Sequence, residues 1–124
     1  MVPLKARPRA WADVESAVRQ MDGDRFPTVC LYLDAEAPED AVPEFELLGG
    51  NIGYVVTARP EQGEFYYRDD SAPSDEVTVW LSDQGFSCSR FMVCPDVERV
   101  LAATRCFFDS GRLLDDFPWS PDFG

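Results

Sequence analysis

The chain has 124 residues, with 23 acidic and 11 basic side chains and a formal net charge of −12. Such a surface repels phosphate, so nucleic acid and anionic membranes are excluded as partners and a basic protein is favoured. With 45% hydrophobic residues the chain can bury a core, which predicts one domain over residues 1–124. The chain contains no histidine, which removes the commonest general base and zinc ligand, so we expect neither cofactor nor metal.

The first part of the chain predicts a helix followed by a strand. Residues 1–9 contain prolines and arginines and are expected to form a loose arm. Apolar residues then recur at spacings of three and four, which predicts a helix over 10–21 that Gly23 ends. Residues 27–34 are β-branched, aromatic and apolar, and they predict a strand at the centre of a sheet.

The middle of the chain predicts further antiparallel strands. An acidic, proline-containing loop leads to an expected edge strand at 45–48, and residues 49–70 predict a hairpin that turns at 59–63. Alternating apolar residues predict two more strands, over 76–81 and 86–93. The glycines in GGNIG have no lysine and are followed by a strand, so they indicate a tight β-turn rather than a phosphate loop.

The strongest helical pattern lies near the end of the chain. Apolar spacing predicts a helix over 95–110, with Pro95 at its first position and Gly111 as its stop. Residues 112–124 are too apolar to extend into solvent and are expected to fold back as a clasp over the core. The predicted class is α+β, with a single antiparallel sheet of about five to six strands and both helices on one face.

The cysteines and the first residues bear on the compartment. None of the four cysteines forms a C-x-x-C pair, and the first residues lack the apolar run of a secretory signal. We therefore expect buried, reduced thiols in a cytoplasmic protein, although an even number of cysteines would permit two disulfides.

The acidic residues gather in two clusters. No lysine or arginine occurs between Arg25 and Arg59, and a second cluster spans 69–76. On the predicted strands, Tyr66 and Trp80 fall opposite the apolar positions, which predicts outward aromatic anchors of a protein interface. The alternative is that the strands pack on one another and cover both rings. The candidate partner-binding residues are Glu36, Glu39, Asp40, Tyr66, Asp69, Asp70, Asp75, Glu76 and Trp80.

The last helix and the residues after it resemble the ending of a known family. Paired alanines, paired phenylalanines, a Gly-Arg step, a leucine and a tryptophan follow one another at Ala102, Ala103, Phe107, Phe108, Gly111, Arg112, Leu114 and Trp119. This pattern resembles the Imm-one immunity-protein family of bacterial polymorphic toxin systems, although Leu113 stands where that family has a proline. The resemblance implies a protein that protects its own cell from a toxin encoded next to it. Several members of the family look like partners of zinc-dependent nucleic-acid deaminases.

We therefore expect a non-enzymatic immunity protein that binds one basic toxin domain and covers its active-site groove. A DNA or RNA cytosine deaminase is the favoured toxin. Two alternatives stay open: a small enzyme or ligand-binding domain with a carboxylate pair in a cleft, and an adaptor or chaperone for a basic secreted effector. Two close carboxylates of raised pKa in a cleft would favour the enzyme, and a flat or convex acidic face would favour the immunity protein.

Overall fold

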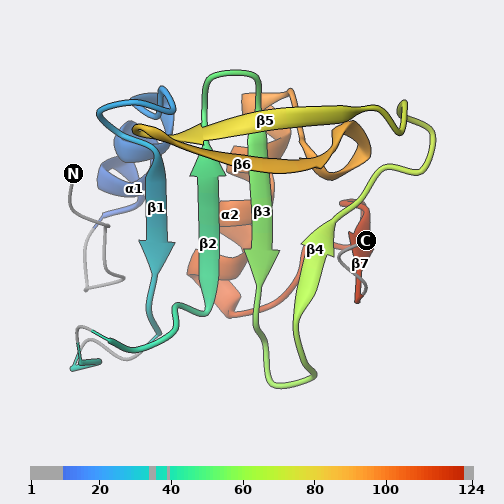
Figure 1. Ribbon diagram of the computed structural model, residues 1–124. Coiled ribbons are helices and arrows are strands. Elements are labelled where there is room, and N and C mark those ends of the chain that lie inside the picture. The colour runs from blue at the N-terminus through green and yellow to red at the C-terminus, as the bar shows by residue number, and fades with distance from the viewer. Residues whose placement is uncertain (1–9, 34–35, 39, 122–124) are drawn as a thin grey trace.

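A computed structural model describes residues 10–33, 36–38 and 40–121. The expected arm at 1–9 and the candidate residue Glu39 lie outside the described residues. Figure 1 shows three layers: two helices lie behind a five-stranded sheet, and a two-stranded ribbon crosses the front of that sheet. The predicted α+β class, with both helices on one face of an antiparallel sheet, is confirmed.

The main sheet has the strand order β1-β2-β3-β4-β7, and all its neighbours are antiparallel. Its strands are β1 (Thr28–Leu31), β2 (Phe45–Gly49), β3 (Tyr54–Ala58), β4 (Phe65–Tyr67) and β7 (Trp119–Ser120). The expected positions of the first two strands are wrong, because β1 lies at the edge and β2 lies between β1 and β3. The prolines that suggested an edge lie in the loop before β2, so every residue of β2 keeps the N–H that pairing on both sides requires.

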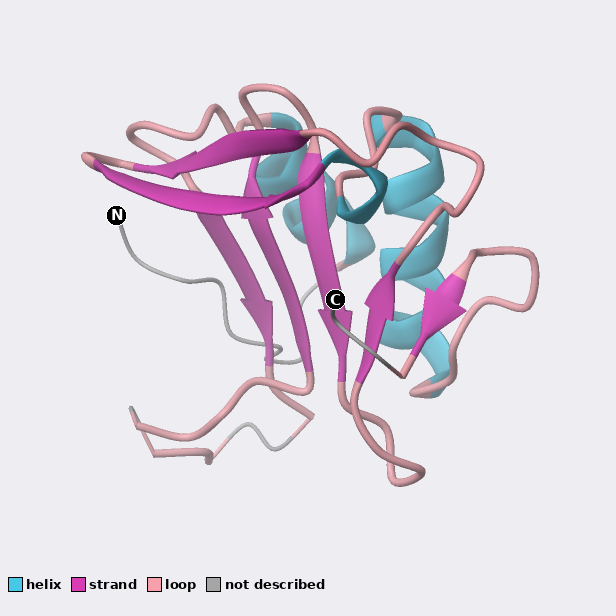
Figure 2. Ribbon diagram, turned by 45° about the vertical axis from the view of Figure 1, so that its right-hand side comes forward, coloured by secondary structure: helices cyan, strands magenta, loops and turns pink. Residues whose placement is uncertain are grey.

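Strands β5 (Glu76–Leu81) and β6 (Gln84–Ser89) form a ribbon of their own instead of extending the sheet. The far edge of β4 is occupied by β7, so the sheet takes its fifth strand from the C-terminal segment. Figure 2 shows the ribbon lying across the sheet face that is turned away from the helices. Gly49 permits this approach, because a Cβ atom there would lie 2.5 Å from Cγ1 of Val79.

The helices are α1 (Trp11–Arg19) and α2 (Val97–Ser110). Asp96 caps α2 by accepting a 2.9 Å hydrogen bond from the backbone N–H of Glu98, and Gly111 ends it in the left-handed conformation with φ 71°. Pro95 therefore lies one residue before the cap and not at the first helical position that we expected. Neither helix among the described residues is long and apolar enough to cross a membrane.

Two apolar clusters hold the layers together. The first lies between the helices and the sheet and includes Val14, Val18, Phe45, Leu47, Val56, Val100 and Phe107. The second lies between the sheet and the ribbon and is formed by Val55, Val79, Cys88, Met92 and Val93. The ribbon is therefore fixed to the sheet by burial of its inner face, and its outer face is presented to solvent.

The C-terminal segment closes the first cluster, as predicted for a clasp. Phe117 is 4% exposed and its ring centroid lies 5.1 Å from that of Tyr67. The backbone N–H of Arg68 donates to the carbonyl of Pro118 at 2.9 Å, and the indole N–H of Trp119 donates to the carbonyl of Leu114 at 3.2 Å. The segment is thus held by both backbone pairing and aromatic packing.

Candidate functional site

The structure separates the predicted binding residues instead of bringing them into one patch. Glu36 and Asp40 are exposed in the loop between β1 and β2, at the end of the sheet farthest from the ribbon. Asp69, Asp70 and Asp75 lie in the loop between β4 and β5 at one side of the molecule. The acidic candidates therefore surround the sheet, and no single flat partner surface contains all of them.

The carboxylates of the β4–β5 loop already have partners. Asp70 forms a 2.7 Å ion pair with Arg68, and Asp75 accepts two 3.1 Å hydrogen bonds from Nε and one of 3.0 Å from Nη2 of Arg90. Oδ1 of Asp69 accepts hydrogen bonds from the hydroxyl and the backbone N–H of Ser71. The pKa of Asp69 and that of Asp75 are both lowered, chiefly by the side-chain hydrogen bonds from Ser71 and Arg90. Since both side chains of the Asp75–Arg90 pair are about half-exposed, a partner's cation can replace Arg90 at little cost.

The two aromatic candidates have different environments. Tyr66 is half-buried and packs against the second apolar cluster beneath the ribbon, and its hydroxyl donates to Glu64. The expectation that its ring points outward is therefore wrong, because the ribbon crosses this face of the sheet. For Tyr66 the alternative applies, in which the strands pack on one another and cover the ring.

Trp80 does lie on the outer face of the ribbon, with 45% of its surface exposed. Its cross-strand neighbour is Gly85, and a Cβ atom there would come within 3.5 Å of Cζ3 of the indole. The ring therefore lies close to the backbone of Gly85, because that residue has no side chain to push the indole away. This arrangement holds a large aromatic surface against the ribbon while leaving its other side open to a partner.

The loop at residues 22–26, which was not among the predicted binding residues, lies beside the end of the ribbon that carries Trp80. The backbone N–H of Ser82, at the tip of the ribbon, donates to the carbonyl of Gly23 at 3.0 Å, and its hydroxyl donates to the carbonyl of Asp24 at 2.8 Å. These bonds hold loop 22–26 beside the tip (Figures 1 and 2). We call Asp24, Phe26, Trp80 and Asp83 the tip surface; all four are exposed, Phe26 by 39%.

A small cavity lies at the other end of the ribbon. Its volume is about 210 Å³, and apolar side chains of Ile52, Tyr67, Ala72, Val77, Val93 and the prolines 73 and 95 form most of its lining. Asp69 and Arg90 supply its charged groups. We call this cavity the socket. It is smaller than the sites of about 300–1,000 Å³ that hold drug-sized ligands and cofactors.

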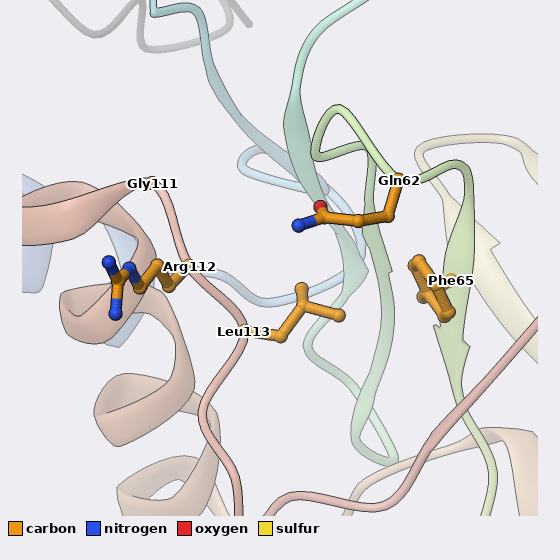
Figure 3. Close-up of a pocket in the computed structure, with 5 residues that line it drawn as sticks. All are labelled: Gln62, Phe65, Gly111, Arg112 and Leu113. Atoms are coloured by element: carbon orange, nitrogen blue, oxygen red, sulfur yellow. The ribbon is translucent and has the colours of Figure 1, made fainter.

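A second cavity, of about 420 Å³, lies between the β3–β4 turn and the residues after α2. Figure 3 shows the side chains of Gln62, Phe65 and Leu113 facing one another across it, whereas the guanidinium of Arg112 points away. Its interior therefore presents an amide and two apolar groups. It offers little chemistry beyond apolar contact.

The sheet face below the ribbon carries a polar network centred on Arg59. Its Nε donates to Glu64 at 2.6 Å, its Nη1 donates to the carbonyl of Pro43 at 2.9 Å, and its Nη2 lies 3.9 Å from Glu46. The pKa of Glu64 is lowered by hydrogen bonds from Tyr66 and Arg59. A general acid needs a raised carboxyl pKa, so this network has the electrostatics of a structural ion-pair cluster.

Cys30 adjoins this network, with Sγ 3.9 Å from a carboxylate oxygen of Glu46. Burial, and then the negative charge of Glu46, raise the pKa of Cys30 to about 12 from an ordinary value of 9.0. Thiolate is the nucleophilic form, so Cys30 is poorly suited to covalent chemistry. All four cysteines are free; Cys30, Cys88 and Cys94 are buried as expected, whereas Cys106 is only partly buried.

The raised pKa of Cys30 predicts a pH dependence of stability. Between about pH 9 and pH 12 the unfolded chain loses this proton while the folded chain keeps it, so the free energy of unfolding falls as pH rises. Cys30→Ala is expected to make this decline shallower in urea unfolding measured across that window. Thr28→Ala, a change without a titrating group on the same strand, should leave the slope unchanged. Equal slopes for Cys30→Ala and the unaltered chain would contradict the assignment.

Comparisons with protein-family models, curated proteins and solved structures find no match. The site is therefore interpreted from its own residues. Within the described part of the chain, no group of three or more histidine, cysteine or acidic side chains is placed to hold a metal ion. The remaining features are the tip surface at one end of the ribbon and, at the other end, the socket with the acidic β4–β5 loop beside it.

Proposed function

We propose that the chain is an immunity protein, which binds a basic toxin domain and neutralises it by covering its active-site groove. The observation that carries the proposal is the exposed ring of Trp80, held over Gly85 on the outer face of a ribbon whose tip carries the exposed residue Asp83. Interface hot spots are enriched in tryptophan, and carboxylates around such an anchor attract a basic partner.

The overall charge supports the same partner. A formal net charge of −12 attracts a basic protein over several ångströms and raises its association rate. A toxin that acts on nucleic acid needs a positive groove for its polyanionic substrate, so an acidic inhibitor can compete for the same charges. We favour a DNA or RNA cytosine deaminase because the C-terminal segment resembles the Imm-one family, and we place the complex in the cytoplasm with one copy of each chain.

The pKa pattern favours a binding protein over an enzyme with a carboxylate pair. Within the described residues, the carboxyl groups whose pKa shifts are Asp22, Glu64, Asp69 and Asp75, and every one of these shifts is downward. The causes are hydrogen bonds from backbone N–H groups, hydroxyls and arginines. Acid–base catalysis by a carboxylate pair needs one group that keeps its proton near neutral pH, which these environments oppose.

The test is isothermal titration of the chain with the toxin domain encoded immediately upstream, together with an assay of that toxin's activity. Protection from a lethal enzyme requires tight binding, so we expect a Kd in the nanomolar range or below, about −12 kcal/mol or stronger. The association rate should fall steeply as salt is added, because the attraction is screened. Micromolar affinity, or a complex in which the toxin stays active, would reject the immunity role; the second result would instead indicate an adaptor.

A further inference from the structure

The socket combines features that suit a particular kind of occupant. It is lined mainly by apolar side chains, and its volume of about 210 Å³ is too small for a cofactor but ample for a side chain. Ile52, part of its lining, is 44% exposed, so apolar surface continues from the cavity to the outside of the molecule. Covering such apolar surface with a partner is favourable, because it removes the surface from water.

The charge beside the socket indicates what that partner carries. Asp69, Ala72 and Pro73 line the socket together with Arg90, and the segment 69–76 that supplies the first three contains four carboxylates and no lysine or arginine. Both hydrogen bonds to Asp69 end on Oδ1, which leaves Oδ2 without a hydrogen bond among the described residues. Asp75 is held by Arg90 in an exposed pair that a competing guanidinium can replace. Cζ of Arg99 lies 6.0 Å from the ring centroid of Tyr67, which lines the socket, and 5.7 Å from that of Phe117.

From these observations we propose that the socket receives one aliphatic side chain, such as leucine, from a basic segment of the toxin. The side chain enters between Ile52, Ala72 and Val77, while flanking arginines or lysines of the same segment pair with Asp69 and Asp75. The inference rests on the proposed function and adds a second anchor, at the opposite end of the ribbon from Trp80. Two anchors at the ends of one rigid ribbon would fix the orientation of the toxin as well as its affinity.

The experiment uses the free chain and needs no toxin. Backbone amide chemical shifts are followed by NMR as a blocked pentapeptide is added, with one leucine between two pairs of arginines. A peptide with serine in place of leucine, and one with glutamates in place of the arginines, are the matched probes. We expect the leucine–arginine peptide to shift the amides of Ile52, Ala72 and Val77 and to bind at least tenfold more tightly than either control, a difference of about 1.4 kcal/mol.

Two socket variants and one control connect the shifts to the cavity. Ala72→Leu fills the socket and should abolish the shifts, whereas Ser74→Leu, an equal apolar addition at an exposed position outside the lining, should preserve them. Ile52→Ser removes apolar surface without filling the cavity, so it replaces Ala72→Leu as the test if that variant unfolds. It should weaken binding of the leucine–arginine peptide at least fivefold. Equal binding of the leucine and serine peptides, or unchanged shifts in both socket variants, would overturn the proposal.

The same variants separate this inference from the proposed function. If the chain fails to bind the toxin but the peptide still enters the socket, the immunity role fails and the socket's preference stands. If the toxin binds with nanomolar affinity and Ala72→Leu leaves that affinity unchanged, the socket proposal is overturned and the immunity role stands. Concentration-dependent shifts of Ile52 and Ala72 in the free chain, absent in Ala72→Leu, would show that a second copy occupies the socket, which also overturns it.

Discussion

Replacing Trp80 by alanine is expected to weaken toxin binding by about 30-fold or more, which corresponds to about 2 kcal/mol. The reason is the environment of the ring, which lies over Gly85 with 45% of its surface open and gains its stabilisation when a partner covers it. Trp80 belongs to neither apolar cluster, so the substitution should leave the fold intact. Titration calorimetry gives the loss of affinity, and circular dichroism checks the fold.

The control for this prediction is Val42→Ala. Val42 is 62% exposed but lies in the loop between β1 and β2, at the opposite end of the sheet from the ribbon. Its removal should change the affinity by less than twofold, whereas Trp80→Phe should retain most of the binding because an aromatic surface remains. A larger loss for Val42→Ala than for Trp80→Ala would move the interface to the acidic loop that contains Glu36 and Asp40.

The local elements of the fold were accessible to sequence analysis. Helix α2 follows from the spacing of its apolar residues, and its C-terminal end follows from Gly111, which adopts a positive φ; its start was expected at Pro95, whereas the cap is Asp96. Gly111 ends the helix and Trp119 pairs with β4, so this segment shapes both the helix end and the clasp. These determinants lie within a few residues of the structure that they specify, so the sequence expresses them directly.

The arrangement of the strands was less accessible, because it depends on contacts between distant residues. Alternation predicts that 76–81 is a strand but does not say which edge it will meet. The two residues of the β7 pairing, Trp119 and Ser120, carry no strand pattern, yet they occupy the edge of β4. With that edge filled, β5 and β6 pair with each other and cross the sheet, and this crossing partly covers Tyr66 while leaving Trp80 exposed.

The candidate site was predicted only in part, because some of its residues are brought together by contacts between distant parts of the chain. The exposure of Trp80 follows from its position opposite the apolar alternation, and its neighbour Gly85 was a signal that could have strengthened the prediction. Phe26 and Asp24 could not be found this way, because only the hydrogen bonds of Ser82 place their loop beside the ribbon tip. The socket, too, is assembled from three separate segments of the chain, around residues 52, 67–77 and 90–95, and no local pattern marks it.

The second large effect is expected at the C-terminal clasp, where Phe117→Ala should lower the free energy of unfolding by about 3–4 kcal/mol. The ring is 4% exposed and lies against Tyr67 and Trp119, at centroid distances of 5.1 and 4.8 Å. Its removal leaves a cavity beneath the segment that holds the outermost strand of the sheet. For a chain of this size, thermal unfolding should shift downward by about 10 °C.

Asp115→Ala is the matched control, because Asp115 is exposed in the same segment and should change stability by less than about 0.5 kcal/mol. Below its unfolding transition, the Phe117→Ala variant should still bind the toxin with near-native affinity, since Phe117 faces the core and not the tip surface. Equal stabilities of the two variants would show that the segment does not close the core. A loss of toxin binding by folded Phe117→Ala would instead place the C-terminal segment in the interface, where the immunity proposal would need a different surface.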